Sequence, residues 1–594
     1  MGLPCERARR GNLNGALVQQ RQGRFAIVEQ LLADGITHMF GNPGTVEQGF
    51  LDAIESYPEL RYITTLQETV AVAMADGYAR ASQRPTVVQL HSGVGLGNGI
   101  GMMYQAKRGG APLVVIAGEA GVRYDSMDAQ MASDLVAMAR PVTKWSTRIV
   151  DPSSTLRVLR RAIKLAATPP RGPVFVALPM DVLDSELSEE VVATSIPDTR
   201  VAPSAEAVAA AAALLASASR PIAIVGDGVA GSGAQAELTR VVELLGAAVW
   251  GANFSEVNID ATHPLFRGQL GHMFGEHSRA ITAEADAVLI CGTYVFPEVF
   301  PALEGVFAPG AKVVHIDLDA YEIAKNFPVD LGLVADPKLT LGLLAAELER
   351  TLSPEQRAAA ERRVGELGER KQRELADAAA ADLEFEGATP LHPSTFMIEL
   401  ARQAPDDVVV FDEALTSSPE LTHHLPPSRP GHYFATRGGS LGVGFPGAIG
   451  LKLALPDKTV VGFSGDGGAM YTIQALWSAA HHDIGAKFVV CNNRSYQLLK
   501  LNVQQYWRER SVADHGFPRS FDLGAPEIRF DELARAMGVP ASRVESAEVV
   551  APAIAEALAA EGPYLIDLML HQEVPGHDEA AANHRPVAGT RAHS

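Results

Sequence analysis

Short apolar runs alternate with helical periodicity along most of the chain. In the first third, runs such as THMFG, TVVQLHS, PLVVIAG and GPVFVALP are separated by stretches such as TVAVAMADGYARA. Such alternation is typical of strand–helix–strand units around a parallel sheet. The pattern recurs twice further along. We therefore predict an α/β protein with three doubly wound parallel-sheet domains, over residues 24–184, 205–349 and 392–572.

The segments between and after these blocks have a different composition. SELSEEVVATSIPDTRVAPS is polar and is predicted to be a linker, whereas residues 353–384 carry mixed charges at helical spacing. The latter pattern predicts a solvated helix that leads to a second linker. Residues 573–594 are polar and aperiodic. We expect a flexible C-terminal tail there, either disordered or acting as a lid.

Composition narrows the class of protein. The chain has 594 residues, 47% hydrophobic and 20% charged, with a net charge of −20. These values favour a multidomain globular protein and argue against a nucleic-acid partner, which requires a basic face. No apolar run is long enough to cross a membrane. Cys5, Cys291 and Cys491 lack metal-site spacing, so we expect reduced thiols in a cytoplasmic protein.

One group of residues, at the ends of two predicted strands in the third block, predicts a binding site for a metal ion and a phosphate. Gly465-Asp466-Gly467 follows the apolar run KTVVGFS, and AKFVVC ends directly before Asn492 and Asn493. Asp466 and Asn493 are 493 − 466 = 27 residues apart, enough for one crossover with a helix beginning near Ala469. Ligands bind beyond the carboxyl ends of parallel strands. A carboxylate and an amide oxygen there suit Mg²⁺, and glycine backbone can approach a phosphate.

GDG alone is a common turn, but GDG with NN at this spacing resembles the motif of the thiamine diphosphate-dependent decarboxylase and acetolactate synthase superfamily. The resemblance covers residues 24–572. It implies a pyrimidine-binding domain, a central domain and a diphosphate- and Mg-binding domain, in that order. It also implies a homodimer or homotetramer with active sites at the subunit interface. The central domain resembles that of acetolactate synthase, but GDGVAGSG lacks a full dinucleotide fingerprint, so we expect no FAD or adenine nucleotide there.

The resemblance also assigns roles to individual residues. Glu68, in LQETVAVAMADGYARAS, is implied to bond N1′ of the cofactor pyrimidine, which promotes loss of the proton from C2 of the thiazolium. Asp466 and Asn493, with the carbonyl of Ser495, are implied to ligate the metal. The remaining implied cofactor contacts are Thr416, Gly439, Leu441, Gly465, Gly467, Gly468 and Ala469.

The candidate substrate-binding residues resemble those of more than one type of enzyme. LHSGVGLGNGIG strongly resembles benzoylformate decarboxylases, which makes His91 a candidate proton relay, and Thr45 occupies their carboxylate-binding serine position. Their second catalytic histidine has no counterpart in GTYVFPEVFPALEG. Gln130 matches an active-site glutamine of benzaldehyde lyase, and Leu498 occupies a position where a small residue is usual.

We therefore expect a thiamine diphosphate- and Mg²⁺-dependent enzyme that cleaves 2-oxo acids or 2-hydroxy ketones through an enamine, with carboligase activity. Two alternatives stay open: an acetolactate synthase-like carboligase that joins two carbonyl substrates, and a non-catalytic paralogue that binds the cofactor. The retained Glu68, Asp466 and Asn493 argue against the paralogue. Substrates would be small 2-oxo acids or aldehydes.

Overall fold

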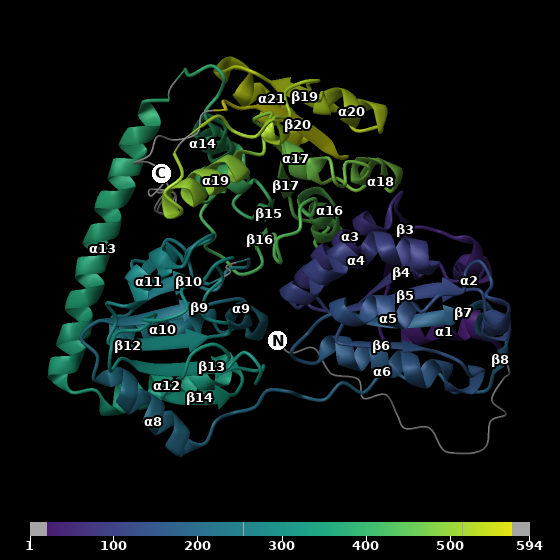
Figure 1. Ribbon diagram of the computed structural model, residues 1–594, viewed down its shortest axis with the longest axis horizontal. Helices are drawn as coiled ribbons and strands as arrows, with labels where there is room; N and C mark the ends of the chain where they lie inside the picture. Colours follow the sequence, from purple (N-terminus) through teal and green to yellow (C-terminus); the bar gives the residue numbers. More distant parts are fainter. Residues whose placement is uncertain (1–20, 253–254, 386, 514, 573–594) are drawn as a thin grey trace, which may run out of the picture.

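The computed structural model contains three parallel sheets of six strands each, which confirms the predicted fold class (Figure 1). It describes residues 21–252, 255–385, 387–513 and 515–572. Cys5 and the proposed tail at 573–594 lie outside the described residues. Among the described helices, none combines the length and apolarity needed to span a bilayer.

The first sheet is covered by helices on both faces. Its strand order is β3-β2-β4-β5-β7-β6. The strands are β2 (His38–Gly41), β3 (Arg61–Thr64), β4 (Thr86–His91), β5 (Leu113–Glu119), β6 (Trp145–Arg148) and β7 (Val174–Pro179). The helices are α1 (Gly23–Ala33), α2 (Gln48–Ile54), α3 (Glu68–Ser82), α4 (Ser92–Gly109), α5 (Leu135–Ala139), α6 (Thr155–Ala167) and α7 (Met180–Asp184). A short antiparallel pair, β1 (Arg21–Gln22) and β8 (Glu186–Leu187), closes the domain.

The central sheet has the order β11-β10-β9-β12-β13-β14 and a separate apolar core. Its strands are β9 (Pro221–Val225), β10 (Ala248–Gly251), β11 (Phe266–Gln269), β12 (Ala287–Cys291), β13 (Lys312–Asp317) and β14 (Leu331–Val334). Its helices are α8 (Ala205–Ala216), α9 (Gly228–Ser232), α10 (Gln235–Leu245), α11 (Glu276–Thr282) and α12 (Pro337–Thr351).

The third sheet has the order β16-β15-β17-β18-β20-β19. Its strands are β15 (Val409–Asp412), β16 (Tyr433–Ala435), β17 (Val460–Gly465), β18 (Lys487–Asn492), β19 (Ala541–Val544) and β20 (Tyr564–Met569). Its helices are α14 (Pro393–Gln403), α15 (Ser418–His424), α16 (Gly444–Ala454), α17 (Asp466–Ala469), α18 (Ala475–His481), α19 (Gln497–Glu509), α20 (Phe530–Ala536) and α21 (Val550–Ala559).

The crossover from β17 to β18 differs from the sequence-based expectation. A single helix beginning near Ala469 was predicted, but α17 begins at Asp466 and ends at Ala469, and a second helix, α18, begins at Ala475. The two strands are adjacent and parallel, with Gly465 opposite Cys491. Both strands therefore deliver their following residues to the same edge of the sheet.

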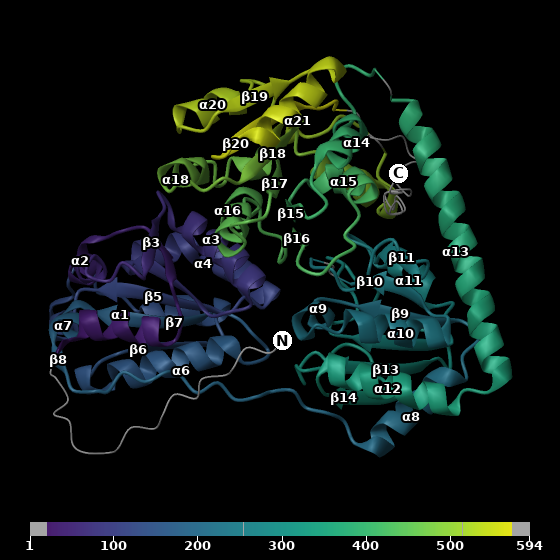
Figure 2. The same cartoon turned by 180° about the vertical axis from the view of Figure 1, so that it is seen from behind.

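A 30-residue helix, α13 (Pro354–Leu383), runs along the outside of the molecule from the central to the third domain (Figures 1 and 2). This confirms the predicted solvated helix. Its N-terminus has a capping box between Ser353 and Gln356. Lys371, which is 2% exposed, donates to the carbonyls of Ala261 and His263 at 2.6 and 2.8 Å and so attaches the helix to the central domain.

Helix α3 of the first domain and helix α16 of the third pack with their backbones in close approach. A Cβ added at Gly77 would overlap the backbone of Gly447, and one added at Gly450 would overlap the carbonyl of Met74. The apolar residues around this contact form one continuous core shared by both domains. Glycine is required here by the space available rather than by backbone conformation.

Charged side chains are buried where all three domains meet. Arg80 on α3 pairs with Glu256 of the central domain at 3.1 Å and lies 3.7 Å from Asp76. Arg437, just after β16, pairs with Asp227, which follows β9. Burial raises the pKa of Asp76 and of Glu256 and lowers that of Arg437 well below its usual value. Charges this deeply buried are stable only when they are paired.

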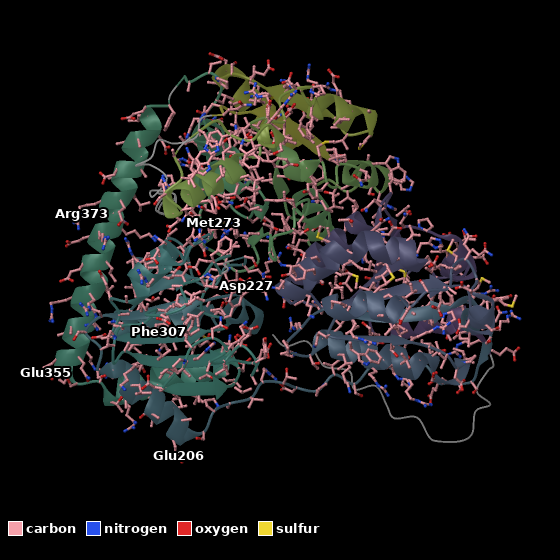
Figure 3. The ribbon with its side chains drawn as sticks, viewed as in Figure 1. Glu206, Asp227, Met273, Phe307, Glu355 and Arg373 are labelled. Atoms are coloured by element: carbon pink, nitrogen blue, oxygen red, sulfur yellow. The ribbon has the colours of Figure 1, made fainter. Side chains whose placement is uncertain are left out.

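Replacing Arg80 with Met should leave the Asp76 and Glu256 carboxylates buried without their cation. Removing one partner of a buried pair costs about 3–5 kcal/mol. The urea midpoint of the first unfolding transition should therefore fall. Arg373→Met on α13 (Figure 3) is the control, because Arg373 is 69% exposed and its loss should cost less than about 0.5 kcal/mol. Equal midpoints for the two variants would contradict a role for the buried pair.

Candidate active site

Asp466 and Asn493 converge at the edge shared by β17 and β18. The backbone N–H of Ser495 donates both to Asp466 Oδ2 at 3.1 Å and to Asn493 Oδ1 at 3.0 Å. Both side chains are more than nine-tenths buried, and burial raises the pKa of Asp466 to about 6. A carboxylate oxygen and an amide oxygen directed to one point are the hard donors that Mg²⁺ prefers.

The other residues of this half of the site have distinct positions. Asn492 points elsewhere, since its amide donates to the buried Asp567 at 2.9 Å. The ring of Tyr496 covers Gly467, where a Cβ would overlap it, while a Cβ at Gly465 would meet open space. Ala469 is buried at the end of α17.

Glu413 was missed by sequence reasoning, although the motif DEALTS drew attention to Thr416. Its side chain is 1% exposed and accepts from the backbone N–H groups of Gly442 and Gly444 at 2.5 and 2.6 Å. Its carbonyl accepts from the N–H of Gly465 at 3.1 Å. Glu413 therefore ties the glycine-rich turn at 438–444 to the GDG loop, and burial raises its pKa to about 7.

The turn at 438–444 contains two further candidate cofactor contacts. Gly439 has φ +77°, which favours glycine, and a Cβ there would meet open space. Leu441 is partly exposed directly before Gly442. Thr416 lies in a short 3-10 turn, partly exposed, next to Leu415, whose φ of 52° is unusual for a bulky residue.

Glu68 begins helix α3 in the first domain and is 4% exposed. Its two carboxylate oxygens accept from the side-chain amides of Asn42 at 3.1 Å and Asn98 at 3.0 Å. Gly95 of α4 packs against the carboxylate, where a Cβ would come within 2.8 Å of Oε1. Sequence reasoning identified Glu68 but neither amide, because no local pattern links residues 42, 68 and 98.

His91 ends strand β4, and its Nδ1 lies 2.9 Å from Glu47 Oε2. Glu47 is 2% exposed and its other oxygen accepts from the backbone N–H of Gly118 at 2.8 Å. Burial raises the pKa of Glu47. Gly44 packs directly on the imidazole, where a Cβ would overlap the ring. The ring is thus fixed on two sides, and Nε2 remains as the atom that can exchange a proton.

Thr45 and Gln130 are both exposed on loops at this end of the first sheet. Thr45 begins the short turn that also carries Glu47. The segment after Gln130 lies against the residue after His91, since Ser92 Oγ donates to the carbonyl of Met131 at 3.5 Å. Thr45 and Gln130 therefore belong to loops that surround His91.

A cavity of about 800 Å³ lies between the central and third domains. Its walls include Glu413, Leu415 and Leu498. His272 and His277 also line it, and burial lowers the pKa of both. Met273, between them, lies in the gap between the two domains in Figure 3. Sequence reasoning missed both histidines. They come from the loop before α11 and from α11 itself, and no local pattern links them to the residues of the third domain on the other side of the cavity.

Phe300, in the segment GTYVFPEVFPALEG that lacks a histidine, contacts a residue of the cavity wall. Phe300 stacks on Phe274 with ring centroids 5.2 Å apart, and Phe274 lines the cavity wall. In contrast, Glu68, His91, Gln130 and Thr45 are not among the residues that line it in the described part of the chain. The candidate residues thus form two groups, one on the first domain and one on the third domain, and of the latter Leu498 lines the cavity.

The glycine-rich loop GDGVAGSG has a structural explanation. Asp227 accepts from the backbone N–H groups of Ser255 and Glu256 at 3.2 and 3.0 Å in addition to its pair with Arg437. Gly228 packs against Gly292, where a Cβ would come within 2.5 Å of the facing backbone. Asp227 and Gly228 of this loop are therefore used within the fold.

Comparison with known proteins identifies the domains. Residues 21–138 match the N-terminal TPP binding domain of thiamine pyrophosphate enzymes, 208–344 the central domain, and 416–568 the C-terminal TPP binding domain. Benzoylformate decarboxylase of Pseudomonas aeruginosa is 32% identical, over 91% of this chain and 98% of that protein. A probable acetolactate synthase large subunit of Methanococcus aeolicus is 28% identical, over 92% of each.

Among solved structures, the thiamine diphosphate-dependent 4-hydroxybenzoylformate decarboxylase of Rhodococcus jostii RHA1 superposes with a TM-score of 0.81 at 28% identity. The match covers 93% of this chain and all of that one. Benzoylformate decarboxylase from Polynucleobacter necessarius gives a TM-score of 0.80 at 25% identity. This chain is therefore similar to these proteins in sequence and in the arrangement of its domains.

The buried Glu413 predicts a pH dependence of stability in the cofactor-free protein. Burial raises its pKa from 4.5 to about 7, so the folded state binds this proton more tightly than the unfolded state. The free energy of unfolding should fall as pH rises from about 4.5 to about 7, by about 3 kcal/mol from this group. Urea titrations at pH 5 and pH 8 measure the difference. Glu413→Gln should reduce it, and an unchanged difference would contradict the assignment.

Proposed function

Because this chain belongs to the thiamine pyrophosphate enzyme family, which includes decarboxylases and acetolactate synthases, we propose that it uses thiamine diphosphate and Mg²⁺ to cleave 2-oxo acids. Coupling of the resulting acyl group to a second carbonyl compound is the proposed accompanying activity. The observation that carries the proposal is the convergence of Asp466 and Asn493 on one backbone N–H. When bound, the cofactor supplies a nucleophilic carbon, C2 of its thiazolium ring, that adds to a carbonyl group.

The residues present fit this cofactor. Asp466 Oδ2, Asn493 Oδ1 and the carbonyl of Ser495 would hold Mg²⁺ with the diphosphate, because all are hard oxygen donors at the edge shared by β17 and β18. Gly439 and Gly465 leave open space beside them. Glu413 keeps the turn at 438–444 and the GDG loop in register, so it acts as a positioning residue.

In the first domain, Glu68 would hold a proton at a pyrimidine nitrogen. Two side-chain amides, from Asn42 and Asn98, donate to the carboxylate and fix its orientation. His91 would exchange a proton with the substrate through Nε2, because Glu47 holds Nδ1. Thr45, on the same turn as Glu47, would contribute a hydroxyl to a substrate carboxylate.

The group on the first domain and the group on the third domain would complete each other across a subunit interface. Helix α4 exposes one stripe, Val94, Gly97, Asn98, Gly101 and Tyr104, directly behind Glu68. Leu66 next to Glu68 is 50% exposed, and Tyr471 near Asp466 is 56% exposed. Apolar surface gathered around both half-sites is typical of a protein interface. We therefore propose a symmetric homodimer, or a dimer of such dimers.

Decarboxylation and coupling differ in how fast a proton reaches the reacting carbon. His91 is one proton source, while His272 and His277 line the cavity as neutral imidazoles, since burial lowers the pKa of each. Gln130 would hold an acceptor carbonyl by a hydrogen bond without supplying a proton. Leu498 lines the cavity and would leave less space than a smaller residue there, which favours small or linear acyl groups over phenyl.

Asp466→Ala should abolish retention of thiamine diphosphate while the fold survives, because it removes one metal ligand at the edge of a sheet. Equilibrium dialysis with Mg²⁺ present measures the affinity. Asp457→Ala is the matched control, since Asp457 is exposed in the same domain. Cofactor affinity equal to that of wild type would exclude Asp466 as a ligand.

Glu68→Gln should bind the cofactor but slow exchange of its C2 proton with deuterated solvent by about 10²–10⁴-fold, the usual contribution of one acid–base group. NMR of the quenched, bound cofactor measures the rate. Exchange at the wild-type rate would place the proton relay elsewhere. Mixing this variant with Asp466→Ala tests the assembly. In a statistical mixture half of the dimers are mixed and each contains one intact site, so about a quarter of wild-type activity should return.

A panel of 2-oxo acids, with and without acceptor aldehydes, tests the reaction. We expect CO₂ from small or linear 2-oxo acids, coupled product when an acceptor is present, and weak turnover of benzoylformate. Gln130→Ala should lower coupled product about fivefold, the value of one hydrogen bond of about 1 kcal/mol, with less effect on free aldehyde. Rapid conversion of benzoylformate to benzaldehyde, without coupling and unaffected by Gln130→Ala, would favour a simple decarboxylase.

A further inference from the structure

The C-terminal end of the long helix α13 meets the end of α15 at a cluster of three side chains, Asp382, His423 and His424. Asp382 Oδ2 lies 3.1 Å from His424 Nε2 and 3.9 Å from His423 Nε2. The ligand-type atoms of all three residues lie within 4.8 Å of one another. Among the described residues, this is the one group of histidine, cysteine and carboxylate side chains so arranged.

The cluster is protected and held by regular structure. The side chains of Asp382, His423 and His424 are 4%, 3% and 14% exposed. The two imidazoles are adjacent in sequence and lie edge to face, with centroids 4.5 Å apart. Asp382 lies in the last turn of α13, where the negative end of the helix dipole favours a cation.

We propose that Asp382, His423 and His424 bind a divalent transition metal of the zinc class, separate from the magnesium proposed at the diphosphate. Two imidazoles and one carboxylate are a ligand set that zinc uses, whereas magnesium takes oxygen ligands. Bonds of about 2.0–2.1 Å in tetrahedral geometry place ligand atoms about 3.3 Å apart. The two carboxylate–imidazole separations of 3.1 and 3.9 Å need shifts of only a few tenths of an ångström, and all three ligand atoms lie within 4.8 Å of one another. Water would fill the fourth position.

Such a metal would fasten two parts of the molecule together. Lys371 attaches α13 to the central domain, and Asp382, eleven residues later (382 − 371 = 11), lies against the third domain. Thr422, directly before His423, lines the cavity between these domains. The bound metal would therefore set the distance between the central domain and the cavity wall formed by α15.

The test uses the full-length protein with thiamine diphosphate and Mg²⁺ at saturating concentration, so that the diphosphate site is occupied. Zn²⁺ is added, excess is removed by dialysis, and retained zinc is measured by mass spectrometry. Wild type should retain one zinc per chain. Since loss of a residue that only supports a ligand costs 10–100-fold in affinity, His424→Ala and Asp382→Asn should each weaken binding at least about 100-fold.

His481→Ala is the matched control. His481 and His482 also end a short helix and lie edge to face, 4.7 Å apart, but His482 accepts from the backbone N–H of Thr64. Zinc affinity should be unchanged in this variant. Co²⁺ gives a second readout: wild type should show the intense visible absorption of a tetrahedral site, and Asp382→Asn, which keeps the side-chain shape, should lose it. Equal zinc retention by all variants, or no retention by folded wild type, would overturn the proposal.

Discussion

The buried pairing of Arg80 and Arg437 with carboxylates is the interaction on which the arrangement of the three domains depends. Arg80 belongs to the first domain, yet it also donates to the backbone carbonyls of Ser255 in the central domain and Ala435 in the third. Its guanidinium lies over the rings of Phe411 and Phe434. Guanidinium groups suit this place because they donate in several directions and tolerate contact with aromatic faces.

This junction also fixes the cofactor side of the third domain. Arg437 is followed directly by Gly438 and Gly439, both with positive φ, and by the turn that Glu413 holds. The turn therefore lies between two anchors, an ion pair at its start and a buried carboxylate at its end. Buried charges contribute little net stability, but they strongly disfavour other arrangements, since each would leave a charge unpaired.

The features that could be predicted from the sequence are those that depend on residues close together along the chain. The fold class followed from periodicity, and Asp466 with Asn493 from strand ends at crossover spacing. The division of the crossover into α17 and α18 was not foreseen, because the periodicity of this stretch fits one helix as well as two. Glu47 and Glu413 could not be found, since each acts through contacts made only in the folded chain: Glu47 holds a histidine 44 residues away. His272 and His277 were missed because the opposite side of the cavity belongs to another domain.

The glycine contact between α3 and α16 affects folding of the chain during its synthesis on the ribosome. Gly77 and Gly447 are 447 − 77 = 370 residues apart, so the surface of α3 that receives α16 is complete long before its partner exists. At synthesis rates of about 5–20 residues per second, this apolar surface stays uncovered for roughly 20–70 s. The first domain thus emerges from the ribosome with part of its core open to the solvent. Chaperone binding to the nascent chain is expected to concentrate on this face and to end when α16 arrives.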